Sequence, residues 1–238
     1  MYYSRIERLK KVISNKWYRR SATAYISYLR RTGVIVGART MIRHQTCHID
    51  LSRPSLITIG EDCFLNDHFT LLTHDFVSGV FVNSGRTFIN SSGRVKIGNN
   101  VRFGHNVMVL KGVTIGDNCF IGAGSIVSKD IPSNSVAVGA PCKVVCTLED
   151  YYQKRLQKSE QEALDYARSI YERFGRRPVL NDFWEEFPWF LDGSKVSYYP
   201  DFAPIVRRQL GISYDNYIKN HHAKYDGLDY FLEAAGIE

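Results

Sequence analysis

The sequence contains few residue patterns of the kind that carry out chemistry. Its five cysteines show no CxxC spacing, and it has no glycine-rich phosphate loop, Ser-His-Asp order or nucleophilic cysteine signature. A histidine lies in the run Thr73-His74-Asp75, directly before residues 76–94. An unperturbed imidazole titrates near neutral pH and can take a proton from a weakly nucleophilic hydroxyl. An isolated histidine is nevertheless more often structural than catalytic.

A six-residue repeat surrounds this histidine and must position it. Residues 97–132 read IGNNVR, FGHNVM, VLKGVT, IGDNCF, IGAGSI and VSKDIP, with a bulky apolar residue first and a small or aliphatic residue fifth in each. A period of six is neither the two of a strand nor the 3.6 of a helix. It predicts a parallel β-helix, in which each hexad forms one face and three hexads close one coil.

The residue types within the hexads suggest how the coils turn. The first side chains should point into a narrow core, and Gly, Asn and Asp at the corners should accept positive φ. The second position is glycine in four hexads: Gly98, Gly104, Gly116 and Gly122. The repeat is also present from Ile59 and, more weakly, from Val36. Residues 76–94 break it, and we expect them to leave the coil as one long loop.

Composition and patterning divide the chain into three regions. Residues 1–33 should be helical, with an apolar stripe on a first helix and a second short helix that stops at Gly33; the stripe comprises Ile6, Leu9, Ile13 and Trp17. Residues 34–146 should form the β-helix. Residues 147–238 should begin with one long helix, and they continue with many large aromatic residues, which favour a small helical core over acceptor binding.

The charge of the chain is +7 and is concentrated in the first thirty-one residues. A solvated helix face explains this as well as attraction to an anionic membrane or a polyanionic substrate does. Nucleic acid is a weaker alternative because no binding motif accompanies the charge. The odd number of cysteines, with no apparent signal peptide and no long apolar run, predicts a reduced cytoplasmic protein, with membrane association as an option.

The segment GVTIGDNCFIGAGSIVSKDIPSNSVAVGAPCKVV, residues 112–145, resembles the last coils of the bacterial hexapeptide-repeat acyltransferases. It especially resembles the galactoside, maltose and capsular-polysaccharide O-acetyltransferases. The resemblance implies a left-handed β-helix, a homotrimer, and acetyl-CoA bound between adjacent subunits. It covers residues 34–146 and leaves both flanking regions unexplained.

The resemblance also implies residues that bind the co-substrate. Ala123 and Gly124 match positions where the backbone contacts the pantetheine arm. Ser128 and Lys129 match positions near the distal pantetheine and the nucleotide, and Lys143 matches a basic position that meets the CoA phosphates. No metal is expected.

Further residues are implied for the acceptor and for catalysis. His74 matches the catalytic histidine, with Asp75 either orienting its ring or forming a turn. Asn66 resembles an asparagine that binds the acceptor, or serves a corner. His105 replaces a frequent serine near the thioester, and Arg102 replaces a common tryptophan, so that the usual lining of the acceptor site is altered.

These matches imply an acetyl-CoA-dependent O-acetyltransferase that acts on a surface-polysaccharide sugar or its precursor by direct transfer in a ternary complex. A sugar-nucleotide N-acetyltransferase or an antibiotic acetyltransferase is the alternative within the same fold. A zinc-dependent carbonic anhydrase on this solenoid would need a histidine pair five residues apart, but Leu110 stands where His105 would need its partner. A non-catalytic scaffold is the last alternative.

Overall fold

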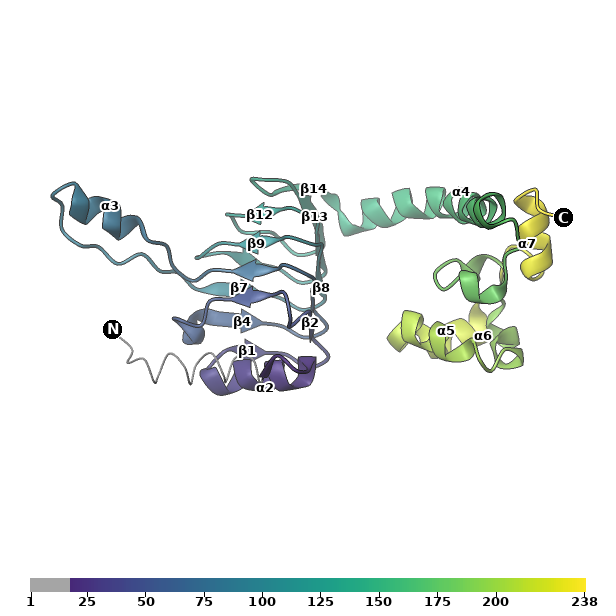
Figure 1. The fold of residues 1–238 in the computed structure, drawn as a ribbon, viewed down its shortest axis with the longest axis horizontal. Coiled ribbons are helices and arrows are strands. Elements are labelled where there is room, and N and C mark those ends of the chain that lie inside the picture. Colours follow the sequence, from purple (N-terminus) through teal and green to yellow (C-terminus); the bar gives the residue numbers. More distant parts are fainter. Residues whose placement is uncertain (1–17) are drawn as a thin grey trace. The chain divides into compact units, whose positions relative to one another are not determined.

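The computed structural model describes residues 18–238, and its first part is a β-helix built from three sheets (Figure 1). Sheet 1 contains β1 (Ile35–Val36), β4 (Ile57–Ile59), β7 (Val95–Ile97) and β10 (Thr114–Ile115). Sheet 2 contains β2 (Met41–Ile42), β5 (Phe64–Leu65), β8 (Val101–Phe103), β11 (Cys119–Ile121), β13 (Ser135–Val138) and β14 (Lys143–Thr147). Sheet 3 contains β3 (His48–Ile49), β6 (Thr70–Leu71), β9 (Met108–Val109) and β12 (Ile126–Val127).

The chain visits the three sheets in turn, so within residues 18–238 each of four circuits adds one parallel strand to every sheet, and β13 adds a fifth parallel strand to sheet 2. Only β13 and β14 pair antiparallel among the paired strands of the described residues, which ends the stack. The predicted left-handed β-helix of hexapeptide repeats, with helical regions on either side of it in the sequence, is confirmed. We call the corner between sheets 1 and 2 edge 1, that between sheets 2 and 3 edge 2, and that between sheets 3 and 1 edge 3.

The first and fifth positions of the hexads form the core, as the repeat predicts. The buried first positions are Ile97, Phe103, Val109, Ile115, Ile121 and Val127. The buried fifth positions are Val101, Val107, Val113, Cys119, Ser125 and Ile131. Stacked and mostly apolar side chains from successive coils therefore fill the prism. The hydroxyl of Ser125 donates to the carbonyl of Gly122 at 2.6 Å, so this buried polar group has a partner.

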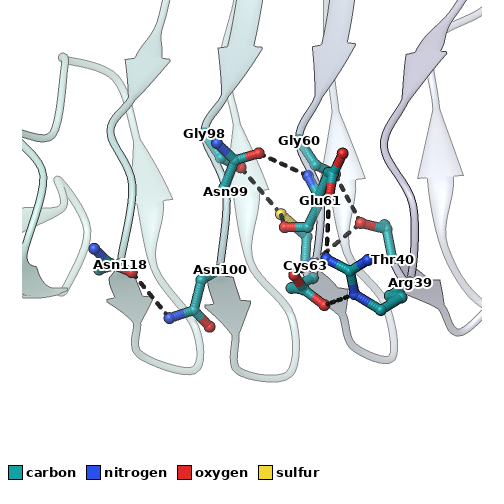
Figure 2. A network of polar contacts seen from close by, with 10 residues as sticks. Arg39, Thr40, Gly60, Glu61, Cys63, Gly98, Asn99, Asn100 and Asn118 are labelled. Carbon is teal, nitrogen blue, oxygen red and sulfur yellow. Dashed lines mark hydrogen bonds and ion pairs between the residues drawn. The ribbon is translucent and has the colours of Figure 1, made fainter. Parts of the chain in front are cut away.

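The positive φ angles fall at the fourth position of the hexads. At edge 1 they occur at Asn100, Asn118 and Asn134, whose side chains join successive coils: the Asn100 amide donates to Asn118 at 3.0 Å, and the Asn118 amide donates to Asn134 at 3.1 Å. In the two earlier coils the same column contains Arg39 and Asp62, which form an ion pair at 2.6 Å. Figure 2 shows Arg39 and the hydrogen bond between Asn100 and Asn118. Side-chain ladders thus hold the strained corner residues in place.

The second-position glycines serve a different purpose from the one we expected, because none of them has a positive φ. A Cβ on Gly98 would lie 2.5 Å from Asp117 Oδ1 and 2.7 Å from the carbonyl carbon of Gly116 on the next coil. A Cβ on Gly104 would lie 2.5 Å from the backbone nitrogen of Ala123. These glycines are required by the close approach of neighbouring coils, not by the turn itself.

Helix α2 (Ala22–Thr32) covers the first coil, as Figure 1 shows. Its N-terminus is capped by the Ser21 hydroxyl and its C-terminus by Gly33 at φ 104°, so the short helix ending at Gly33 is confirmed. The buried side chains of Tyr25 and Leu29 join the core of the β-helix. The apolar stripe predicted for the first helix lies in residues 1–17, outside the described residues.

Residues 76–94 leave the coils between β6 and β7, but they are not structureless throughout. They contain the short helix α3 (Val77–Asn83), which the sequence analysis did not predict, and project from the stack (Figure 1). We refer to them as the excursion. Its base is a short antiparallel contact in which Gly93 N–H donates to the Thr73 carbonyl at 2.9 Å and His74 pairs with Ser92.

The chain divides into two compact units, of which the second comprises Gln153–Glu238. The long helix α4 (Leu148–Phe174) leads into it. The remaining elements are η2 (Leu180–Asp182), η3 (Phe187–Trp189), η4 (Gly193–Tyr198), α5 (Ala203–Leu210), η5 (Gly211–Ser213), α6 (Tyr214–Asn220) and α7 (Leu228–Ala234), in addition to η1 (Pro54–Leu56) of the first unit. Buried rings such as Phe183, Phe187 and Phe231 form a separate core there.

Candidate functional site

His74 lies at edge 3, where sheet 3 ends and the excursion begins. The strands β3 and β6 pair with Ile49 opposite Leu71, so the residues that follow them emerge at the same edge. The pairing brings the Asp50 carboxylate to His74: Oδ2 lies 2.6 Å from Nδ1. The two side chains are 9% and 19% exposed respectively, so the pair is shielded but can be reached from solvent.

The Asp50 carboxylate is held by several donors. Its Oδ2 accepts from the Thr73 backbone N–H at 3.0 Å and from the Thr73 hydroxyl, and its Oδ1 accepts from the Ser52 backbone N–H at 3.0 Å. Burial acts to raise the pKa of Asp50, but the hydrogen bonds from Thr73 and Ser52 outweigh it and hold the pKa well below its usual range. Asp50 is therefore ionised at neutral pH.

An ionised carboxylate can only accept hydrogen bonds, which fixes the tautomer of His74. Nδ1 must carry the hydrogen that it donates to Asp50, and Nε2 on the other side of the ring carries the lone pair. The Ser52 hydroxyl lies 3.2 Å from the same Nδ1, and the ring of Phe76 contacts the imidazole edge to face at 5.0 Å. The arrangement is an oriented base that can accept a proton at Nε2.

Asp75 does not orient His74. Its Oδ2 pairs with the Lys111 ammonium at 2.8 Å, and its Oδ1 accepts from the Val77 N–H at 3.1 Å at the start of α3. The hydrogen bond from Lys111 and that from Val77 lower the pKa of Asp75 to about 2. Lys111 also donates to the Ser91 hydroxyl. One ammonium from the next coil therefore contacts both Asp75, just before the excursion, and Ser91, near its end.

Sequence reasoning missed Asp50, the residue that orients the histidine. The signal that could have found it was the weak upstream repeat. In that repeat the buried Ile49 is equivalent to the buried Leu71, so Asp50 and Leu72 follow equivalent strand residues. Ser52 and Lys111 were missed for the same reason. Each is recognisable only once the register of the coils is known.

Several of the predicted site residues gather at edge 2. The N–H of Gly124 donates to the carbonyl of His105 at 2.8 Å, and Ala123 and Gly124 are both exposed residues. The imidazole of His105 is 60% exposed and lies 4.0 Å from the carboxylate of Asp67. Asn66 accepts from the N–H of Asp67 at 2.9 Å through its own side chain, which is the corner role.

The other predicted residues lie elsewhere on the prism. Arg102 is exposed on the outer face of β8, with its guanidinium 6.0 Å from the ring centre of Phe64. Ser128 and Lys129 follow β12 at edge 3 and are exposed, and Lys143 is exposed on β14. A single chain therefore places His74 at edge 3 and His105, Ala123 and Gly124 at edge 2, with sheet 3 between them.

A hollow of about 610 Å³ lies beside edge 2 and next to α2. Its lining includes Arg43, His44, Phe64 and Asp67. The Arg43 guanidinium lies 5.7 Å from the centre of the Phe64 ring, and the buried Nε2 of His44 has no hydrogen-bond partner within residues 18–238. The volume is that of a site for a small molecule.

The described part of the chain shows neither a metal centre nor a membrane span. Within residues 18–238, no group of three or more His, Cys, Asp or Glu side chains could hold a metal ion. None of the helices in that range is long and apolar enough to cross a bilayer. All five cysteines are free thiols.

Comparison with known proteins finds similarity centred on the coils. The family model described as bacterial transferase hexapeptide (six repeats) matches residues 94–129. Galactoside O-acetyltransferase of Escherichia coli (strain K12) is 44% identical over 103 residues, which are 41% of this chain and 49% of the relative. A putative acetyltransferase of Bacillus subtilis (strain 168), YvoF, is 32% identical over 112 residues, which are 47% of this chain and 59% of the relative.

A solved structure of galactoside acetyltransferase in complex with coenzyme A is 28% identical, with a TM-score of 0.47 and coverage of 61% of this chain and 82% of that chain. The chain spans about half the length of the curated relatives it matches. The matches confirm the resemblance to the hexapeptide-repeat acetyltransferases that the motif of residues 112–145 indicated.

Proposed function

We propose that this chain is an acetyl-CoA-dependent O-acetyltransferase that acts on the hydroxyl of a surface-polysaccharide sugar or its precursor. The observation that carries the proposal is the Asp50–His74 pair at 2.6 Å, at the base of an excursion from a hexapeptide β-helix. The relatives that share the repeat are named as acetyltransferases, among them a galactoside O-acetyltransferase.

His74 and Asp50 have separate roles in the proposed acetyl transfer. Nε2 of His74 removes the proton of the acceptor hydroxyl as its oxygen attacks, and Asp50 stabilises the imidazolium that forms. His74 then returns the proton to the departing thiolate. Acetyl-CoA supplies the thioester whose acetyl group is transferred directly in a ternary complex.

The residues proposed to hold acetyl-CoA fit its chemistry. Ala123 and Gly124 are exposed at edge 2 and carry little or no side chain, which leaves room for a long, thin pantetheine arm. The exposed ammonium groups of Lys129 and Lys143 suit the phosphates of the nucleotide. Ser128 would contact the distal pantetheine, and His105 would donate to the thioester carbonyl.

A complete site would need more than one copy of the chain. The proposed base lies at edge 3 and the proposed pantetheine contacts lie at edge 2, so edge 3 of one copy must meet edge 2 of another. A homotrimer with three shared sites satisfies this requirement. In that arrangement the hollow lined by Arg43, Phe64 and Asp67 would face the His74 of the neighbour and receive the acceptor, with Asn66 and Arg102 at its margin.

Acetyl-CoA turnover tests the proposal. Thiol release is followed with sugars that have or lack a free amino group, which separates O-transfer from the alternative of N-transfer. His74→Ala should lower kcat by about 10² to 10⁴ with little change in the KM for acetyl-CoA, and His74→Asn should be nearly as impaired. His222→Ala, an exposed histidine of the second unit, is the matched control.

Two outcomes would count against the proposal. Near-normal turnover by His74→Ala on the preferred acceptor would move the base elsewhere, with His105 first to be examined. A stable monomer that binds CoA would contradict the shared site.

The basic N-terminal segment is proposed to contact anionic lipid peripherally. Vesicle co-sedimentation of the chain with and without residues 1–20 would test this contact.

A further inference from the structure

Two adjoining hollows lie on the surface of the second unit. One has a volume of about 330 Å³ and the other of about 400 Å³, and Leu180 and Tyr199 line both. Each is near the lower end of the volumes of small-molecule sites. Together they form one surface with two compartments, both lined by Leu180 and Tyr199, which we call the tyrosine surface.

Three tyrosines expose their rings along this surface. Tyr198 is 75% exposed, Tyr230 58% and Tyr199 44%. The unit does not need them for its own core, which is built from other rings such as Phe187 and Phe231. Exposed tyrosines in hollows offer a flat apolar face with a polar edge, the form that packs on the C–H face of a sugar ring.

Two polar side chains line the first hollow together with Tyr198 and Tyr199. The amide of Asn181 and the carboxylate of Asp201 line the same hollow as Tyr198 and make no hydrogen bond within residues 18–238. By contrast, the charged groups of the neighbouring hollow are satisfied: Lys195 pairs with Asp226 at 2.6 Å, and Asp229 with Arg177 at 2.7 Å. A free amide and a free carboxylate beside a ring are suited to binding vicinal hydroxyls.

The charge of the tyrosine surface selects among glycans. The two hollows are lined by three carboxylates, of which Asp226 is neutralised by Lys195 and Asp229 by Arg177, so the negative charge left unpaired on this face is that of Asp201. A sialic or uronic acid polymer would bring further negative charge to this face, whereas uncharged hydroxyls can donate to the free carboxylate of Asp201. The complementary ligand is a neutral hexose chain.

We propose that the tyrosine surface is a second, non-catalytic glycan site that binds two neighbouring units of a neutral polysaccharide. The inference rests on the proposed function in that it assigns the same polymer to both units of the chain. Binding at this surface would raise the local concentration of acceptor hydroxyls around the catalytic pair without taking part in the transfer.

Affinity electrophoresis of the full chain in gels containing galactan, dextran or polysialic acid tests the site. The native chain should be retarded by a neutral polymer and not by polysialic acid. Tyr198→Ala and Asp201→Asn should each weaken retardation about three- to tenfold, the loss expected for one ring contact or one charge-assisted hydrogen bond. Tyr171→Ala, with a ring 47% exposed on α4, is the matched control and should bind like the native chain.

Kinetics separate this site from the proposed function. In Tyr198→Ala the KM for a polymeric acceptor should rise while kcat and the KM for a monosaccharide acceptor stay unchanged. His74→Ala should bind galactan normally. Loss of galactan binding in Tyr198→Ala would support the site even if no sugar were acetylated.

Three results would overturn the glycan site. They are the absence of retardation by both neutral polymers, a preference for polysialic acid, and a Tyr198→Ala variant that binds as tightly as the native chain. A change of oligomeric state in Tyr198→Ala by light scattering, with glycan binding unchanged, would instead show that the tyrosine surface is a contact between copies of the chain.

Discussion

Replacement of Asp50 by asparagine tests the role that the structure gives to this carboxylate. The substitution keeps the size of the side chain but removes the charge that lies 2.6 Å from Nδ1 of His74. The amide can present its NH₂ group to Nδ1, which favours the tautomer with hydrogen on Nε2 and leaves no base for the acceptor. We expect kcat to fall by about 10³, or about 4 kcal/mol in the activation barrier.

The variant should also lose some stability. Asp50 accepts hydrogen bonds from both the N–H and the hydroxyl of Thr73, and an amide that turns its NH₂ toward them leaves a buried donor unsatisfied. The expected loss is about 1–3 kcal/mol in the free energy of unfolding. Because the folded-state pKa is depressed, the contribution of the native carboxylate is present above its unfolded value of about 3.9 and is lost as the pH falls through the folded value.

Steady-state thiol release and thermal unfolding measure the two effects separately. Asp62→Asn is the matched control, because Asp62 is an ion-paired carboxylate at edge 1 and should leave kcat unchanged. The KM for acetyl-CoA should be unaffected in both variants. A folded Asp50→Asn protein with kcat within threefold of native would refute the orienting role.

Three further changes test other parts of the site and fold. Lys111→Met removes the ammonium that contacts Asp75 and Ser91 at the base of the excursion. It should lower kcat/KM about tenfold or more, while the free energy of unfolding changes by no more than about 1 kcal/mol. Steady-state kinetics and thermal unfolding measure the two effects, and a kcat/KM equal to that of the native chain would contradict the prediction. When the logarithm of kcat/KM is plotted against pH, the acid side of the profile should have a slope of one, because Asp50 stays ionised there. A slope of two would show that the Asp50 carboxyl also gains a proton in this range. Gly98→Ala should destabilise the β-helix by about 1–3 kcal/mol, because its Cβ would meet the Gly116 backbone. Gly79→Ala is the control, because its Cβ would meet no atom within 4 Å, and denaturant unfolding should show no loss of stability in this variant.

The hexad pattern was sufficient to predict the core because each side chain's direction depends only on its place in the repeat. Ile97 and Val101, for example, are buried in the first and fifth positions of one hexad. The pattern did not separate two kinds of corner glycine. Gly124 has a positive φ in the fourth position, whereas Gly98 makes room for the next coil in the second, and only the stacking of coils distinguishes them.

The partner of His74 was hidden by a shift in the repeat. Ile42 pairs with Leu65 and Ile49 with Leu71, so the first coil uses seven residues at edge 2 where the second coil uses six. Counting in sixes from Ile42 places His48, not Ile49, in the buried position. With this count Asp50 is no longer aligned with the residues before His74. The hydrogen bond between Asp50 and His74, twenty-four residues apart, therefore cannot be predicted from the repeat.

The two halves of the proposed site differ in what a single chain can complete. The base needs only Asp50 and His74, which neighbouring coils of one chain hold at the same edge. The proposed pantetheine contacts at Ala123 and Gly124 lie on the far side of sheet 3. In the proposed function, the register of two strands prepares proton transfer, whereas its coupling to acetyl transfer would depend on contact between two copies. Substitutions at the dyad should impair kcat without dissociating the assembly, and substitutions that dissociate the assembly should leave the dyad intact.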